Sequence, residues 1–317
     1  MKKLLSVMLI VVMVFAMTAC GNSSDAEYPD GTITSIVNFS AGGGSDLAAR
    51  ALCDKAAELM GCTITTTNIT GGSGTVGAAE LANEDPDGYT IGFVPTASMA
   101  LTPLFVDGAN YTVDDFDYIC GFGQYGYGIV VNNDSEFKSM DDVIAAMKKG
   151  TLKFGITGYP QPFAMYELAN QVGGSVEAVS YPSTTDMITD VMGGFLDICV
   201  ADEASFAAYV RSGDVTLLAG CCEDRWISGP DVPTLLELGY DVKLEAYLAM
   251  VAPKGIDADK LAILRDAFET AAQDKKFIEI MNNANQHVSF MTGEDYEAFM
   301  KEKAVEFKDL YAKYGTN

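Results

Sequence analysis

The 317-residue sequence carries 44 acidic and 20 basic residues, a formal net charge of −24. This surplus of negative charge opposes binding to nucleic acid or to an anionic membrane surface, because both would repel it. The sequence has a single histidine, His287, and none of its seven cysteines forms a Cys-x-x-Cys pair. A zinc site of the usual kind is therefore not expected, and we predict no metal and no cofactor.

The first residues predict a secretory signal peptide. Lys2 and Lys3 precede a largely apolar run at 4–17, which small residues follow. The run is shorter than the roughly 20 residues that a membrane-spanning helix needs. Cys20 comes directly after this small-residue segment, which resembles a bacterial lipoprotein box and implies cleavage before Cys20 and a lipid on its sulfur. The alternative is an ordinary signal peptide with an incidental cysteine.

Removing the signal peptide, residues 1–19, would leave 298 of the 317 residues and lower the net charge to −26, because two lysines are lost. That length suits two domains of ordinary size. The composition of the next residues suits a flexible tether. The expected organisation is a lipidated tether at 20–27, lobe 1 at 28–124 plus 250–317, and lobe 2 at 125–249.

Strands, glycine-rich turns and helices alternate in the first third of the chain. Short β-branched runs predict the strands, and apolar residues at helical spacing predict the helices. Their order predicts a parallel sheet covered by helices. The predicted elements are strand 33–39, turn 40–45, helix 46–60, strand 63–68, turn 71–74, helix 75–83 and strand 89–94.

The same alternation recurs in the middle of the chain and predicts a second sheet. The segment 124–131 is interpreted as the connection into this second lobe, and 245–251 as the strand that leads out. Two α/β lobes joined by two crossings can close around a ligand like a hinge. The remaining predicted elements are strands 152–156, 178–181, 197–201 and 215–219 and helices 163–172, 183–192, 258–272 and 293–314.

Glycine-rich turns that lead into helices are candidate anion sites. Glycine lets backbone N–H groups approach a ligand, and the helix that follows points its positive dipole end at the same place. Such turns lie at 40–45 and 71–75 in the first lobe and at Thr157–Gly158 in the second. Plain loop geometry is the alternative for each turn. The chain has only four arginines, and Arg50 is expected to pair with Asp46 along its helix.

Enzyme signatures are weak. The run Gly72–Gly77 matches G-x-G-x-x-G, but the stretch 92–97 has no acidic residue where a dinucleotide site should have one. The match to S-x-x-K at 135–138 lacks its companion motifs. His287 is interpreted as a surface residue. We therefore do not expect an enzyme.

Six cysteines follow Cys20, and their spacing does not assign pairs. An exported protein can form disulfides, but the apolar surroundings of most of these residues favour buried free thiols. They are Cys53, Cys62, Cys120, Cys199, Cys221 and Cys222.

An ordered set of motifs from about residue 28 to the C-terminus resembles the substrate-binding receptors of tripartite tricarboxylate transporters, the Bug-type receptors. Asn38 and Thr70 stand where that family usually has proline, and 159–162 continues the third turn unusually. These departures affect the contacts expected with the far end of a ligand more than those expected with its carboxylate. The matching segments are Ile33–Asp46 with Arg50, Gly71–Gly77, Pro86–Thr90, Leu152–Gly158, Tyr181, Asp190–Gly194 with Asp197, and Pro230–Gly239.

The resemblance implies a two-lobed, type II periplasmic-binding-protein-like fold with two lobe crossings and a cleft between the lobes. It also implies a monomeric lipoprotein that is exported, anchored to the outer face of the cell membrane, and hands a small organic acid to membrane permease subunits. An enzyme or a sensory lipoprotein on the same fold is the alternative. The candidate ligand-binding residues are Phe39, Ser40, Ala41, Gly42, Gly43, Gly44, Ser45, Gly72, Ser73, Gly74, Thr75, Ser98, Thr157, Gly158, Tyr181 and Asp202.

Overall fold

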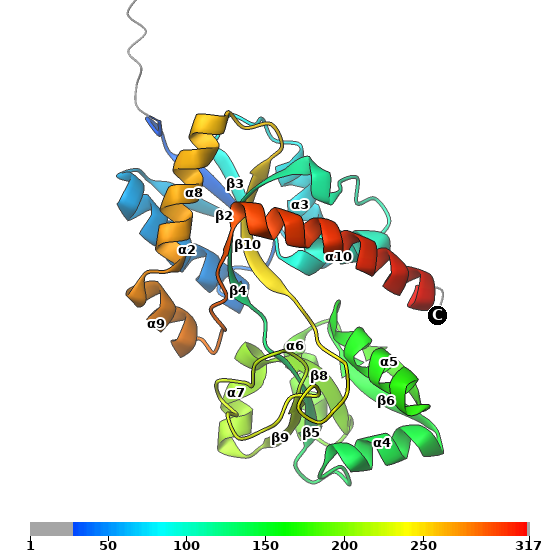
Figure 1. Ribbon diagram of the computed structural model, residues 1–317. Helices are drawn as coiled ribbons and strands as arrows, with labels where there is room; N and C mark the ends of the chain where they lie inside the picture. The colour runs from blue at the N-terminus through cyan, green and yellow to red at the C-terminus, as the bar shows by residue number, and fades with distance from the viewer. Residues whose placement is uncertain (1–27, 316–317) are drawn as a thin grey trace, which may run out of the picture.

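The computed structural model describes residues 28–315, which form two α/β lobes, each built around one sheet (Figure 1). This confirms the two-lobed fold class. The predicted signal peptide, Cys20 and the tether lie outside the described residues. No helix within residues 28–315 is both long enough and apolar enough to cross a membrane.

Within the described residues, the first sheet has six strands in the order β11-β4-β10-β3-β1-β2. β1 pairs in parallel with β2 and β3, whereas β10 runs antiparallel to β3 and β4. The carboxyl ends of β1 and β2 therefore lie side by side at one edge of the sheet. The strands are β1 Ile33–Val37, β2 Ile64–Asn68, β3 Thr90–Phe93, β4 Phe116–Gln124, β10 Tyr247–Pro253 and β11 Met291–Thr292.

Helices cover both faces of this sheet. Side chains alternate along β1 and contribute to the core on each face of the sheet, since Ile33 and Val37 pack on one face and Ile36 on the other. The helices α2, α8 and α9 share the first of these cores, and α3 and α10 the second. Their bounds are α2 Gly44–Met60, α3 Thr75–Ala82, α8 Ala258–Ala272, α9 Lys275–Asn283 and α10 Gly293–Tyr314.

The second sheet has five strands in the order β7-β6-β8-β5-β9, again within the described residues. β6 is parallel to β7 and β8, and β5 is antiparallel to β8 and β9. The helices α4 and α5 pack on one face, and α6 and α7 on the other. The elements are β5 Tyr127–Asn132, α4 Met140–Lys149, β6 Thr151–Ile156, α5 Gln161–Val172, β7 Ser175–Ser180, α6 Thr184–Met192, β8 Ile198–Asp202, α7 Glu203–Ser212 and β9 Val215–Gly220.

The predicted connection 124–131 does contain the link into the second lobe, but most of this segment is the strand β5. All six residues of β5 are buried, and the strand lies inside the second sheet, between β8 and the edge strand β9. The actual link from β4 to β5 is just 125–126. A continuous apolar run is typical of a strand that is buried on both faces, and here the surrounding glycines concealed it.

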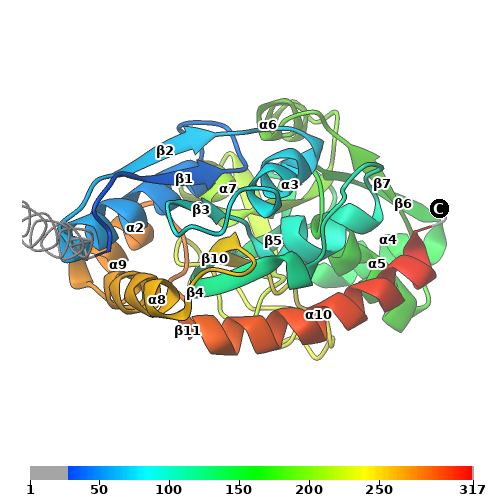
Figure 2. The ribbon, with the colours of Figure 1, turned by 90° about the horizontal axis from the view of Figure 1, so that it is seen from above.

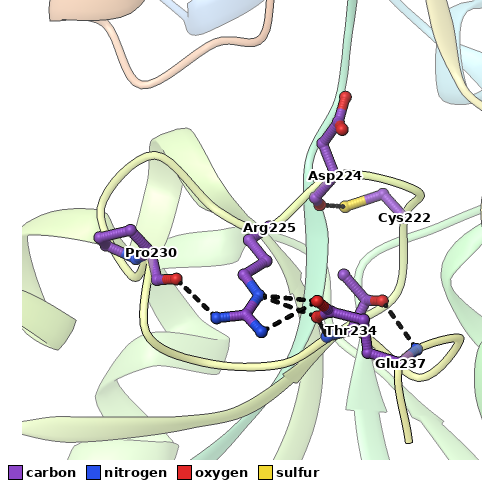
Figure 3. Close-up of polar contacts among 6 residues, drawn as sticks. All are labelled: Cys222, Asp224, Arg225, Pro230, Thr234 and Glu237. Carbon is purple, nitrogen blue, oxygen red and sulfur yellow. Dashed lines mark hydrogen bonds and ion pairs between the residues drawn. The ribbon is translucent and has the colours of Figure 1, made fainter.

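The chain returns from β9 to the first sheet through residues 221–246, and an exposed ion pair ties this segment together (Figure 3). Arg225 Nε lies 2.8 Å from Glu237 Oε2, and Arg225 Nη1 donates to the carbonyl of Pro230 at 2.9 Å. The same Glu237 oxygen accepts the Thr234 N–H at 2.8 Å. Trp226 anchors the segment in the core of the second lobe, where it is 1% exposed.

All six described cysteines are free thiols, and five of them are buried, with Cys62 partly exposed. Burial raises the pKa of Cys53 and of Cys222 to about 12. These thiols are therefore protonated at neutral pH and pack as small apolar side chains.

Candidate functional site

A cleft of about 720 Å³ lies between the two lobes. The turn after β1 and the start of α2 line it from the first lobe, and the starts of α5, α6 and α7 line it from the second. Tyr125, between β4 and β5, and residues 284–286, after α9, complete the wall. Four helices therefore present their N-terminal ends to one cavity, which is the arrangement that favours an anionic group.

The cleft brings together a subset of the predicted ligand-binding residues, drawn from both lobes. Those that line it are Phe39, Ser40, Gly44, Ser45, Ser73, Ser98, Thr157, Gly158 and Asp202. The predicted residues that do not line it are Ala41, Gly42, Gly43, Gly72, Gly74, Thr75 and Tyr181.

A buried carboxylate braces the first turn. Asp46, 2% exposed, accepts the N–H of Gly42 at 2.9 Å, Arg50 Nε at 2.9 Å and Asn68 Nδ2 at 2.8 Å. Burial by itself would raise the pKa of Asp46, but these hydrogen bonds and the charge of Arg50 outweigh it and hold the pKa below its usual value. The predicted pairing of Arg50 with Asp46 is confirmed. The N–H of Gly42 is thus used inside the turn and is not presented to a ligand.

The first turn of α2 supplies the donors that face the cleft. An α-helix leaves its first N–H groups without intrahelical partners, and the N-cap residue Gly43 provides no side-chain cap. Gly44 and Ser45, which follow it, line the cleft. A Cβ on Gly44 would come within 2.6 Å of Gln286 Nε2, so any side chain there would displace this amide. Ser45 Oγ lies 2.5 Å from the hydroxyl of Tyr125, and this contact joins the start of α2 to the link 125–126 between the lobes.

The glycines of the second turn serve packing. A Cβ on Gly77 would come within 2.5 Å of the Ile69 carbonyl, and one on Gly74 within 2.6 Å of Ser98 Oγ. Only Ser73 of this turn lines the cleft, with a left-handed backbone at φ 53°. Ser98 Oγ donates to the Ser73 carbonyl at 3.2 Å and holds it there.

The candidate turn of the second lobe is occupied by a side chain of its own helix. Gln161 Oε1 accepts the N–H of Thr157 at 2.6 Å, the N–H of Gly158 at 3.2 Å and Thr157 Oγ1 at 3.2 Å. Gln161 is 5% exposed. The backbone N–H groups that could bind a ligand at this turn are therefore already hydrogen-bonded to Gln161.

Asp202 both caps a helix and lines the cleft. It is the N-cap of α7, where its carboxylate accepts the N–H and the hydroxyl of Ser205, each at 2.9 Å. It also lines the cleft. Burial raises the pKa of Asp202, although the Ser205 hydrogen bonds oppose the shift. Among the described residues that line the cleft, Asp202 is the one aspartate, glutamate, lysine, arginine or histidine.

Tyr181 lies outside the cleft lining, where its hydroxyl donates to Asp190 Oδ2 at 2.9 Å.

His287 is not a surface residue, so its interpretation from the sequence was wrong. Its side chain is 14% exposed, and Nε2 lies 2.8 Å from Oε2 of the fully buried Glu203. This contact links Glu203 at the start of α7, in the second lobe, to the segment after α9. His287 also forms a β-bridge with Gln124 at the end of β4.

Several cleft residues were missed by sequence reasoning. Gln286 is the most consequential, since it is 2% exposed and neither of its amide atoms has a partner. No sequence motif marks it, because it reaches the cleft through the packing of α9. Tyr125, Tyr159 and Gln161 also line the cleft. No group of three or more potential metal ligands occurs within residues 28–315.

Comparisons with known proteins agree with this architecture. Residues 48–315 match the model of the tripartite tricarboxylate transporter family receptor. A Cupriavidus necator protein, the UPF0065 protein in the gbd 5' region, is 30% identical over 294 residues, which are 91% of this chain and 89% of that protein. The Bordetella pertussis protein BugT is 28% identical over 281 residues, 86% of each chain.

Among solved structures, an R. palustris protein with adipate has the same fold, with a TM-score of 0.80 at 18% identity, over 91% of this chain and 99% of that one. The motifs predicted this relationship, and the matched residues span both lobes. The chain belongs to the receptor family of the tripartite tricarboxylate transporters.

Proposed function

We propose that this receptor captures a small carboxylate in the cleft and delivers it to the permease subunits of a tripartite tricarboxylate-type membrane transporter. The observation that carries the proposal is the uncapped N-terminus of α2, whose first turn lines an interlobe cleft. Neutral backbone donors and a helix dipole can hold a carboxylate without a cationic side chain. The chain acts by reversible binding and as a monomer.

The proposal includes an exported protein held at the outer face of the cell membrane by a lipid on Cys20. Its lobes are residues 28–124 plus 250–317 and residues 125–249. The N-terminal charge pattern and the position of Cys20 support the export and the anchor. Cys20→Ser should move the protein from the membrane fraction to the soluble fraction and abolish incorporation of labelled fatty acid. A variant that stays with the membrane and keeps the label would refute the anchor.

Binding is tested by thermal shift against small carboxylates, neutral sugars and inorganic cations. A ligand that binds only the folded protein stabilises it by mass action, by about 2.7 kcal/mol at a hundredfold excess over Kd. We expect the melting temperature to rise with carboxylates. A rise confined to sugars or cations would overturn the proposal.

Gly44→Ala tests the position of the carboxylate. The added methyl group would displace Gln286 Nε2 and narrow the space above the first turn of α2. We expect calorimetry to show a Kd raised by about tenfold or more. Gly150→Ala is the matched control, because a Cβ there meets nothing within 4 Å and Gly150 lies outside the cleft lining. Equal affinity of the two variants would exclude α2 as the carboxylate site.

A further inference from the structure

The charge of the cleft lining disfavours a second carboxylate. Asp202 is the charged side chain among the described residues of the lining, and Lys, Arg and His are absent from that set. Burial raises the pKa of Asp202, because the hydrogen bonds from Ser205 replace only part of the hydration that its carboxylate loses. A second anionic group brought beside it would add like-charge repulsion.

The backbone donors at the start of α5 are not free to compensate for this. The N–H groups of Thr157 and Gly158 already donate to Gln161 Oε1. A second carboxylate at the start of α5 would have to displace the side chain of Gln161, which is buried. At the start of α7 the second lobe offers an acceptor, Asp202, and at the start of α5 its amides are already paired.

Gln286 adds an unpaired amide at the junction of the two lobes. Both of its amide atoms are buried without a partner among the described residues. A Cβ on Gly44 would lie 2.6 Å from Gln286 Nε2 and 3.9 Å from Ala204 Cβ, so the starts of α2 and α7 approach each other at this amide. An amide carries donors and an acceptor, so one Gln286 side chain can serve an anionic and a cationic group together.

Asp202 keeps acceptor capacity for a ligand. Each of its oxygens receives one hydrogen bond from Ser205, and a carboxylate oxygen has about two lone-pair sites. Its register partner in the second sheet is Tyr127, which also lines the cleft. A charged donor on the ligand would satisfy the remaining capacity with a short, charge-assisted hydrogen bond.

We propose that the cleft selects a carboxylate that carries a protonated amino group, an amino-acid-type zwitterion, over a dicarboxylate. The carboxylate lies at the first turn of α2, and the ammonium group faces Asp202 and the amide of Gln286. This inference rests on the proposed function and names the ligand class of the same site.

The test begins with the purified full chain and a thermal-shift panel. The panel contains the standard amino acids together with succinate, glutarate and adipate at equal concentrations. Calorimetry then compares the best amino acid with its analogue lacking the amino group. We expect the amino acid to bind about tenfold more tightly or better, the scale of a charge-assisted hydrogen bond.

Asp202→Asn tests whether Asp202 is responsible for the preference for an amino acid over its analogue without the amino group. Asparagine is as good an N-cap as aspartate, so α7 should be retained. We expect the variant to bind the amino acid about tenfold more weakly and the analogue unchanged. Asp257→Asn is the matched control, because Asp257 caps α8 in the same way and lies outside the cleft lining.

The outcomes separate the two proposals. Dicarboxylates that bind more tightly than every amino acid, or an Asp202→Asn variant with an unchanged preference, would overturn the zwitterion assignment and leave carboxylate capture standing. A panel without any carboxylate or amino-acid binding would overturn the proposed function as well. Unaltered melting temperatures of both variants in the absence of ligand show that the fold is retained.

Discussion

At the scale of single residues, Asp46 sets the shape of the turn that presents α2 to the cleft. Asp46→Asn would place an amide donor against the donors of Gly42 and Arg50, so we expect a loss of about 1–3 kcal/mol in the free energy of unfolding at neutral pH. Asp54→Asn, on an exposed residue of the same helix, should change little. Urea unfolding measures both.

The pH dependence of this effect has a definite sign. The pKa of Asp46 is lower in the folded protein than its ordinary value of 3.8. Its stabilising contribution is therefore complete above that ordinary value and is lost as pH falls through the folded pKa. The difference between wild type and Asp46→Asn should narrow as the pH falls below 3.8. A difference that is constant with pH would show that the carboxylate charge is not what stabilises the turn.

Gln286, in contrast to Asp46, is expected to lower the stability of the ligand-free protein while it strengthens ligand binding. An unpaired buried amide costs about 1–3 kcal/mol, and methionine fills a similar volume without polar atoms. We expect Gln286→Met to raise the melting temperature of the ligand-free protein while weakening carboxylate binding. A variant that melts at a lower temperature would indicate that the amide is paired in the protein.

At the scale of elements, the return segment 221–246 depends on the ion pair of Arg225 and Glu237 (Figure 3). Both side chains are largely exposed, so the pair should order the segment locally more than it stabilises the whole protein. Arg225→Lys keeps the charge but loses the two-pronged geometry. We expect several-fold faster amide hydrogen exchange within 225–239 and an almost unchanged melting temperature. Exchange as slow as in wild type would mean that Trp226 alone anchors the segment.

The elements also show where sequence reasoning succeeded. α10 was predicted at both ends, since Thr292 caps it by accepting the N–H of Asp295 and an apolar stripe runs along it. β4 was not predicted, because Gly121 and Gly123 interrupt its apolar pattern and a strand in this position forms by pairing with β10 and β11. Capping and periodicity are local properties, whereas strand pairing is decided by distant residues.

At the scale of the whole molecule, an aromatic contact joins the lobes on the side of α10. Phe105, before β4, stacks on Tyr159 at the start of α5, with ring centroids 4.2 Å apart. Lys313 and Tyr314, at the end of α10, contact Glu167 of α5. Figure 2 shows α10 extending past the first sheet toward α5. Because Tyr159 also lines the cleft, this contact holds one wall of the ligand site in place.

Phe105→Ala should loosen the two lobes without removing a cleft residue. An aromatic pair contributes about 0.5–1.5 kcal/mol beyond its area, so we expect ligand affinity to fall by about two- to tenfold. Small-angle scattering should report a larger radius of gyration in the ligand-free variant, which ligand restores. Phe195→Ala is the control, since Phe195 is 86% exposed. Unchanged affinity in Phe105→Ala would show that the lobes are positioned by the hinge alone.

By itself, the sequence determined the strand-turn-helix units of the first lobe, the ion pair of Asp46 with Arg50 and the family. Each of these depends on residues close together in the chain, through periodicity, capping or i,i+4 spacing. Only the tertiary structure decided that β5 is an interior strand, that Gln161 fills its own turn and that Gln286 meets Gly44. Gly44 and Gln286 are far apart in sequence, and the packing of α9 and α2 on the first sheet brings them to one cleft.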